Sequence, residues 1–154
     1  MFIQRVSEAL RERGVPFAIV GGYAVALHGA VRGTVDLDIV LRLKREDFIA
    51  AEEALRSVGL MPRLPVSAAQ VFDFRQEYIE NKNLIAWSFS NPSNPTEVVD
   101  VIVTHDLRKL RVKDIPFGKR TLPVLALDDL IAMKTDGGRP QDLEDVKALR
   151  ELRR

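Results

Sequence analysis

The sequence predicts an α/β (α+β) fold, in which a mixed, twisted β-sheet is flanked by helices. Short apolar, β-branched runs alternate with amphipathic segments in the first half, and further strand-like runs separated by Asn, Pro and Ser follow in the second. With 154 residues and 46% hydrophobic composition, the chain can bury one sizeable core. We therefore expect a single domain over residues 1–154, with C-terminal helices from about residue 125 packing on its core.

The first part of the chain reads as helix, strand, helix, strand, helix. Apolar residues recur at helical spacing from Ile3 to Arg13, and Gly14 and Pro16 end that helix. A buried strand is expected from Phe17 to Val20. The next expected elements are a turn at Gly21 and Gly22, a helix closing near Gly29, a strand over TVDLDIVL (34–41), and a helix from about Glu46 to Val58.

The second half is expected to hold further strands, a hairpin and two helices. The strand-like runs are VFDFRQ (71–76), LIAWSFS (84–90) and EVVDVIV (97–103). Residues 112–125 read as a short hairpin with its turn near Gly118. Helical spacing returns from Leu125 to Met133 and from Leu143 to Leu152, on either side of the breaker TDGGRP (135–140).

Composition excludes several classes of function. The net charge of +1 gives no global attraction to nucleic acid, so an RNA contact would depend on a local patch. Without cysteine there is neither a disulfide nor a thiolate metal site, which favours a cytoplasmic protein. The amphipathic, charged N-terminus is unlike a signal peptide, and no apolar run approaches the roughly 20 residues of a membrane span.

The glycine pair Gly21-Gly22 lies at a predicted strand-to-helix turn. Glycine lets the backbone approach an anion closely, and the N–H groups at the start of the following helix face such a ligand. This turn is therefore expected to bind phosphate.

An Asp-x-Asp follows at Asp36 and Asp38. In a strand the two carboxylates share one face, while Val35, Leu37 and Ile39 take the other. Carboxylates so placed repel each other unless a cation lies between them, and hard oxygen ligands suit Mg²⁺ (or Mn²⁺) together with substrate phosphates. A phosphate-binding turn beside a metal-ligand pair points to phosphoryl or nucleotidyl transfer.

Asp100 interrupts an otherwise apolar strand, where burial of an isolated charge is costly. Beside the Asp36 and Asp38 strand it would complete a three-carboxylate cluster for one or two metal ions. Alternatively, it faces solvent on an edge strand or pairs with an arginine.

The order of Gly-Gly, Asp-x-Asp and a later lone Asp resembles the nucleotidyltransferase superfamily related to DNA polymerase β. The resemblance implies a nucleotidyltransferase-like fold, a triphosphate bound at Gly21 and Gly22, and metal ions held by Asp36, Asp38 and Asp100. With the C-terminal stretch LDDLIAMKTDGGRPQDLEDVKAL, the sequence is similar to a branch that includes the abortive-infection nucleotidyltransferase toxins. Residues from about Pro62 to Pro95 match nothing in that family.

The branch carries a Lys on one helix and an Arg-x-x-Asp-x-x-Asp leading into the next, which Lys134, Arg139, Asp142 and Asp145 match. Lys134 could reach a phosphate and Arg139 could grip one through its planar fork. The alternative for Lys134 and Asp142 is charge placement at helix ends. Asp145 is read as a salt-bridge partner or a surface residue.

Arg32 and Thr34 lie between the glycines and the metal strand, where resembling proteins carry similar residues. Arg32 either contacts the triphosphate or pairs with an active-site carboxylate. His28, at the end of the helix after the glycines, is read as structural rather than as a base. Aromatic residues on the expected strands are read as core packing, with nucleobase stacking as the lesser alternative: Phe72, Phe74, Trp87 and Phe89.

These observations predict a metal-dependent nucleotidyltransferase that moves a nucleoside monophosphate from a nucleoside triphosphate to an acceptor hydroxyl. The acceptor belongs to tRNA or another RNA, a partner protein or a small molecule, and the resemblance suggests a toxin–antitoxin setting. One rival is a nucleotidyltransferase-like binding or regulatory module without turnover. The other is an RNA-binding module that uses the basic run Arg108, Lys109, Arg111 and Lys113, which is otherwise a solvated face.

Overall fold

The computed structural model describes residues 1–30, 33–34 and 36–153. The predicted site residue Arg32 lies outside this part of the chain, as does Val35. The described elements are, in chain order, α1 (Phe2–Glu12), β1 (Phe17–Val20), α2 (Gly21–Leu27), β2 (Leu37–Leu41), α3 (Arg45–Ser57), β3 (Met61–Pro62), α4 (Ala68–Asp73), α5 (Arg75–Lys82), β4 (Ala86–Asn91), β5 (Asn94–Ile102), the 3₁₀ turn η1 (Leu107–Lys109), β6 (Val112–Phe117), β7 (Arg120–Leu125), α6 (Leu127–Gly137) and α7 (Pro140–Leu152).

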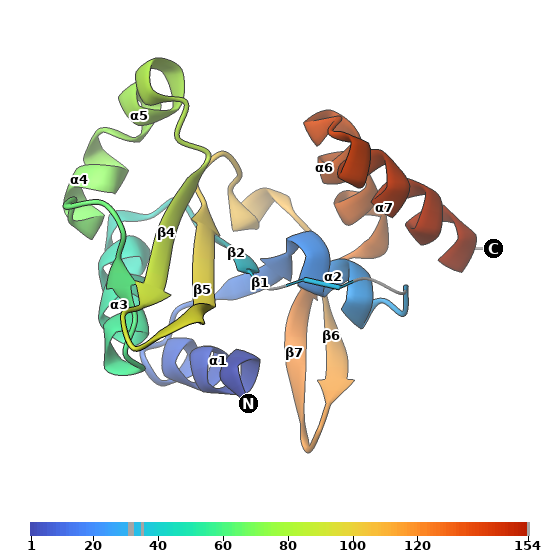
Figure 1. Ribbon diagram of the computed structural model, residues 1–154, viewed down its shortest axis with the longest axis horizontal. Coiled ribbons are helices and arrows are strands. Elements are labelled where there is room, and N and C mark those ends of the chain that lie inside the picture. The colour runs from blue at the N-terminus through green and yellow to red at the C-terminus, as the bar shows by residue number, and fades with distance from the viewer. Residues whose placement is uncertain (31–32, 35, 154) are drawn as a thin grey trace.

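The described strands form one mixed sheet in the order β3-β4-β5-β2-β1-β7-β6; Figure 1 labels all of these strands except β3. β2 pairs with β5 in parallel and with β1 antiparallel, while β1 and β7 run parallel. The predicted mixed α/β sheet is confirmed, as are the initial helix-strand-helix-strand-helix order and the hairpin β6–β7. The strand predicted over 34–41 is shorter than expected, because β2 begins at Leu37 and Asp36 precedes it.

One face of the sheet carries the large aromatic core. Side chains alternate between the two faces of a strand, and in β4 both Trp87 and Phe89 are buried whereas Ser88 between them is half-buried. Trp87 stacks on Phe48 of α3 with 5.8 Å between ring centroids, and Phe48 meets Phe72 of α4 edge-on. Helices α3 and α4 therefore cover this face, and the packing interpretation of Trp87 and Phe89 is confirmed.

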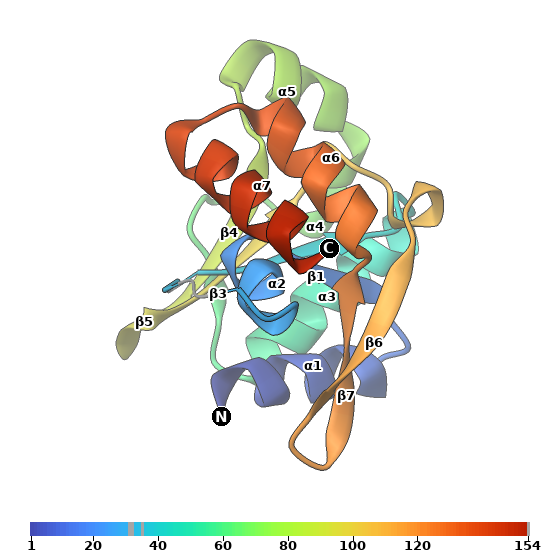
Figure 2. The same cartoon turned by 90° about the vertical axis from the view of Figure 1, so that its right-hand side faces the viewer.

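The opposite face is covered only in part. Helix α2 packs on β1, β2 and β7 and also contacts α6, which packs on α7. Figure 2 shows α6 and α7 side by side over α2. On this face Ser88 of β4 and both Asp100 and Ile102 of β5 are half-buried rather than buried, so an open strip of sheet remains beside α6.

The strand predicted over VFDFRQ is wrong. Val71 to Asp73 belong to α4, the chain turns at Phe74, and Arg75 begins α5. Helix α4 starts with a capping box, in which the Ser67 side chain accepts a hydrogen bond from Gln70 N and the Gln70 side chain accepts one from Ser67 N. The strand-packing interpretation of Phe72 and Phe74 is corrected accordingly: Phe72 packs from a helix, and Phe74 is exposed.

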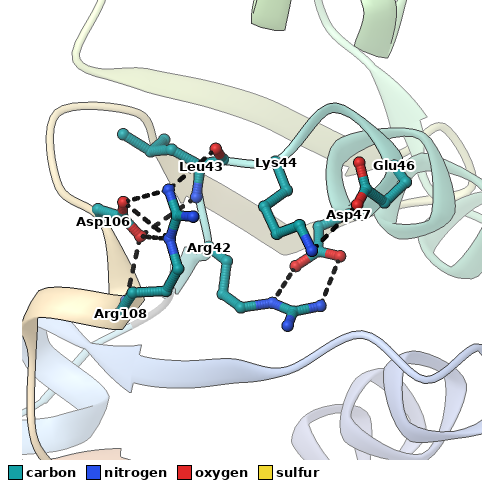
Figure 3. A network of polar contacts seen from close by, with 7 residues as sticks. All are labelled: Arg42, Leu43, Lys44, Glu46, Asp47, Asp106 and Arg108. Carbon is teal, nitrogen blue, oxygen red and sulfur yellow. Dashed lines mark hydrogen bonds and ion pairs between the residues drawn. The ribbon is translucent and has the colours of Figure 1, made fainter.

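The far end of β2 is tied to the segment after β5 by a polar network, drawn in Figure 3. The Asp106 carboxylate accepts hydrogen bonds from Leu43 N (3.3 Å), from Arg108 N (3.0 Å) and from the Arg108 guanidinium (2.8 Å). Nearby, the guanidinium of Arg42 donates two hydrogen bonds to Asp47 at the start of α3. The Asp106 contacts hold the ends of β2 and β5 together opposite Asp38, and the Arg42–Asp47 pair joins the end of β2 to α3.

Among the described helices, none is long and apolar enough to cross a membrane.

Candidate active site

The glycine turn is placed as predicted, directly after a buried strand. β1 ends at Val20 and α2 begins at Gly21, whose φ of +66° is a backbone conformation that favours glycine. Gly22 is buried in the first turn of α2 and lines a cleft on the partly covered face of the sheet. Gly21 has a second reason to lack a side chain, because the Asp38 carboxyl lies against it.

Asp38 and Asp100 are direct neighbours across the parallel strands β2 and β5, at one register position. Asp36 lies just before β2 and is exposed. All three carboxylates line the same open cleft of about 530 Å³. Because β5 lies between β4 and β2, the edge-strand alternative for Asp100 is wrong.

The electrostatics of the cleft are dominated by the crowding of like charges. Burial raises the pKa of Asp38, the negative charges of Asp100 and Asp36 raise it further, and the pKa reaches about 7. The positive charges of Lys134 and Arg139 oppose this rise. The cleft therefore strongly favours the approach of a cation to its carboxylates.

Ser88 is a site residue that sequence reasoning missed. It sits opposite Asp100 in the antiparallel register of β4 and β5, and its Oγ donates a 2.6 Å hydrogen bond to Oδ1 of Asp100. This bond gives the Asp100 carboxylate a hydrogen-bond partner within the sheet. Only a polar residue on the alternating face of LIAWSFS hinted at it.

Lys134 is nearly buried between two carboxylates of α7. Its Nζ lies 3.3 Å from Oδ1 of Asp142 and 2.9 Å from Oδ2 of Asp145. Of the two alternatives for Asp145, a surface position and a salt bridge, the structure shows the salt bridge, with Asp145 buried. Gln141, a lining residue that the sequence did not single out, donates a 3.0 Å hydrogen bond from Nε2 to Oδ1 of Asp145.

Arg139 is an exposed cation of the cleft, with a side chain that is 73% exposed. Its Nε donates a 3.0 Å hydrogen bond to Oδ2 of Asp142, and its backbone N–H donates to the same oxygen at 3.3 Å. Burial tends to raise the pKa of Asp142, but these hydrogen bonds and the charge of Lys134 outweigh it and lower that pKa. Asp142 thus anchors both cations beside the acidic cluster.

The remaining predicted residues have simpler surroundings. Thr34 lines the cleft and is half-buried. His28 caps α2, with its Nε2 2.7 Å from the carbonyl oxygen of Leu125, so its structural interpretation is confirmed. In the part of the chain that the structure describes, no three His, Cys, Asp or Glu side chains form a ready-made metal-ligand group; a three-carboxylate metal site remains a prediction.

The basic run considered for RNA binding is partly neutralised. The Arg108 guanidinium is paired with Asp106, and that of Arg111 lies 3.2 Å from Asp129. Paired arginines leave less positive charge for phosphate contacts. This pairing weakens the RNA-binding alternative.

Neither a family model nor a curated protein matches the sequence. Solved structures do match. The antibiotic-resistance factor ANT(2'')-Ia aligns over 98% of this chain and 80% of its own, with TM-score 0.64 and 14% identity. The lincosamide antibiotic adenylyltransferase LnuA, solved with lincomycin bound, aligns over 98% and 96%, with TM-score 0.63 and 11% identity. A nucleotidyltransferase-like protein from Paracoccidioides brasiliensis aligns over 95% and 72%, with TM-score 0.59 and 15% identity.

The chain has the nucleotidyltransferase fold. The fold implied by the motif resemblance is therefore confirmed. The narrower likeness to the abortive-infection toxins stays a prediction. Within this nucleotidyltransferase fold, the glycine turn and the three carboxylates come from separate segments that the sheet brings to one cleft.

Proposed function

We propose that this protein is a nucleotidyltransferase that moves a nucleoside monophosphate from a nucleoside triphosphate to an acceptor hydroxyl and releases pyrophosphate. One observation carries the proposal: Asp38 and Asp100 are register neighbours in a cleft that the glycine turn also lines. The likeness to known nucleotidyltransferases supports it.

Asp36, Asp38 and Asp100 would hold one or two Mg²⁺ or Mn²⁺ ions. These three residues suit such an ion, because they offer hard carboxylate oxygens. In addition, a bound cation would relieve the repulsion between carboxylates that raises the pKa of Asp38. Such a cation would supply charge neutralisation on the triphosphate oxygens.

Triphosphate binding and proton transfer are assigned to different residues of the chain. The backbone N–H groups at Gly21 and Gly22 bind the triphosphate, because a strand-to-helix turn presents free donors there. Asp100 accepts the proton of the acceptor hydroxyl on the oxygen that Ser88 does not occupy. The acceptor oxygen then bonds to the α-phosphorus as the bond to the bridging oxygen breaks, and pyrophosphate leaves with that electron pair.

The two cations have different tasks. Arg139 is exposed and carries a planar fork, so it grips the departing phosphates. Lys134 is buried in its ion pairs and contributes its charge from the cleft wall. Asp142, which the sequence placed among the nucleotide-binding residues, acts through these cations by holding them in place. Thr34 and Arg32 complete the predicted nucleotide-binding set.

The acceptor is a small hydroxylated molecule, an RNA such as tRNA, or a partner protein. The small-molecule choice is favoured by the structural neighbours, since LnuA is an antibiotic adenylyltransferase and ANT(2'')-Ia has been solved with adenylyl-2''-tobramycin. The toxin–antitoxin setting rests on the motif resemblance, and there the acceptor would be RNA or protein.

The test uses nucleoside triphosphates labelled at the α-phosphate, with Mg²⁺ and total cell extract, and fractionates the products into small molecules, RNA and protein. Label should enter one fraction with the wild type and not with Asp38→Asn. The same triphosphates labelled at the γ-phosphate should leave that fraction unlabelled. Label from the γ-phosphate alone would show phosphoryl transfer, and no label from any triphosphate would favour the binding-module alternative.

A further inference from the structure

A second, smaller pocket of about 270 Å³ opens beside the polar cleft. It lies between α6 and the uncovered strip of sheet where β5 ends and β4 begins. Its apolar wall consists of Val20, Ile85, Ile102 and Met133. Ile85 is 53% exposed, so its side chain is accessible to a ligand in this pocket.

This apolar pocket and the polar cleft adjoin each other. Asp38 and Arg139 line both of them, as do Lys134 and Asp142. The glycine turn also spans the two, because Gly22 lines the cleft and Gly21 lines the pocket. A single ligand can therefore place a polyanionic end in the cleft and an apolar end in the pocket.

A nucleoside triphosphate has these two ends: a charged phosphate chain, and a flat base whose faces are apolar. The acceptor fits less well, because under the proposed function its hydroxyl must lie at Asp100, which lines the cleft but not the pocket. The volume also suits a nucleobase, since it falls just below the roughly 300–1,000 Å³ of pockets that hold drug-sized ligands.

We propose that the apolar pocket binds the nucleobase of the donor triphosphate, between the side chains of Ile85, Ile102 and Met133. This assignment rests on the proposed function. Polar atoms for the edge of the base come from Thr104 and His105, whose Oγ1 and Nδ1 lie 2.9 Å apart in the same wall. The aliphatic wall supplies apolar contact to any base, and the polar pair supplies selectivity among bases.

The test compares two ligands with each protein by calorimetry in Mg²⁺. One is the α,β-methylene analogue of each nucleoside triphosphate, which cannot transfer its nucleotide, and the other is inorganic tripolyphosphate. Met133→Trp fills the pocket, and the matched control Met61→Trp makes the same change on β3, outside both the polar cleft and the apolar pocket. Ile85→Ser removes part of the wall at an exposed position, where the fold tolerates it.

The wild type should bind at least one analogue about tenfold or more tighter than tripolyphosphate, because the base adds apolar contact. Met133→Trp and Ile85→Ser should lose that difference and keep their tripolyphosphate affinity, and Met61→Trp should behave as the wild type. If Met133→Trp does not fold, Ile85→Ser decides. Equal affinity of the wild type for both ligands, or a difference that survives both variants, would overturn the base assignment while leaving triphosphate binding intact. Failure to bind either ligand would overturn the proposed function and this assignment together.

Discussion

The carboxyl group of Asp38 fills the space that a β-carbon on Gly21 would need. A Cβ built at Gly21 would lie 2.0 Å from Oδ2 of Asp38, well inside van der Waals contact. The two residues are brought together by the antiparallel register of β1 and β2, in which Val20 faces Asp38. Gly21, the first residue of the turn, therefore also leaves the space that the Asp38 carboxyl occupies.

Gly21→Ala should destabilise the protein and abolish its metal-dependent nucleotide affinity, because the new methyl group displaces the Asp38 carboxyl. Gly14→Ala is the matched control: Gly14 has nearly the same positive φ, +65°, and a Cβ added there would meet nothing within 4 Å. Its cost in urea unfolding should be about 1 kcal/mol, the strain of the backbone alone. Gly21→Ala should cost clearly more, and adding Asp38→Ala should recover the excess. Equal costs for the two glycine variants would contradict the steric argument.

Asp38→Asn should stabilise the protein in the absence of metal at pH 8 and leave its stability nearly unchanged at pH 4. The pKa of Asp38 is raised from 3.8 to about 7 in the folded state, so the folded protein binds more protons than the unfolded chain between these values. Stability then falls as the pH rises through that window. Thermal melts of both proteins from pH 4 to pH 8 in a chelator check this. Asp114→Asn, at an exposed carboxylate of β6, controls for the loss of one negative charge and should show no such trend.

Ser88→Ala should lower the transfer rate while leaving the affinity for the triphosphate nearly unchanged. The hydroxyl of Ser88 fixes the orientation of Asp100, and Asp100 is proposed to accept the proton of the acceptor hydroxyl, while Asp36 and Asp38 would still hold the cation on the donor. The measurement is kcat and KM for the donor, once an acceptor is known. Ser88→Thr, which keeps the hydroxyl, should restore the rate. Ser90→Ala, on the same face of β4, should have little effect; an equal loss in both alanine variants would indicate a general weakening of the strand.

Arg139→Gln should mainly lower the affinity for triphosphate, whereas Lys134→Met should mainly lower the free energy of unfolding. Arg139 is largely exposed, so its loss should weaken triphosphate affinity by about tenfold with little effect on unfolding. Lys134→Met leaves the buried carboxylates of Asp142 and Asp145 without their shared cation, which should cost about 3–5 kcal/mol. Urea unfolding and calorimetry with tripolyphosphate check the two effects. A Lys134→Met variant of normal stability would show that its ion pairs do not hold α6 to α7.

Asp106→Asn should destabilise the protein by about 1–2 kcal/mol at pH 7, since it weakens several hydrogen bonds of the network in Figure 3. The hydrogen bonds from Arg108 hold the pKa of Asp106 at about 2, below its ordinary value of 3.8. The stabilisation of the folded state by the Asp106 carboxylate is therefore fully present above pH 4 and is lost as the pH falls through 2. Urea unfolding at pH 7 and at pH 2 measures the difference, which should shrink at the lower pH. A constant difference would mean that the charge of Asp106 is not involved.

Local patterns predicted most of the fold. β-branched runs bounded by glycine or proline marked β1, β2 and β5, and these strands were found within a few residues of their predicted bounds. VFDFRQ was misread because alternation of apolar residues over so short a run also fits one turn and a half of helix. The decisive signal was the preceding Ser67-x-x-Gln70, a capping box that announces a helix.

The placement of the candidate site could be predicted from short motifs, but not where it depends on the register between strands. Gly21, Asp36 and Asp38 form one local pattern. The pairing of Ser88 with Asp100 depends on how β4 aligns with β5, which no local pattern specifies. In the same way, the spacing of Lys134 and Asp145 does not reveal that α6 and α7 pack so closely that the amine is buried between carboxylates.

The parallel pairing of β2 with β5 has a kinetic consequence. Asp38 and Asp100 become neighbours only after the chain has closed a long loop through α3, α4, α5 and β4, and closure of such loops is slow and entropically costly. Hairpins such as β6–β7 can form early, from local contacts alone. We therefore expect the acidic cleft to be among the last parts of the molecule to assemble, so that the proposed binding of cations and triphosphate would require a complete sheet.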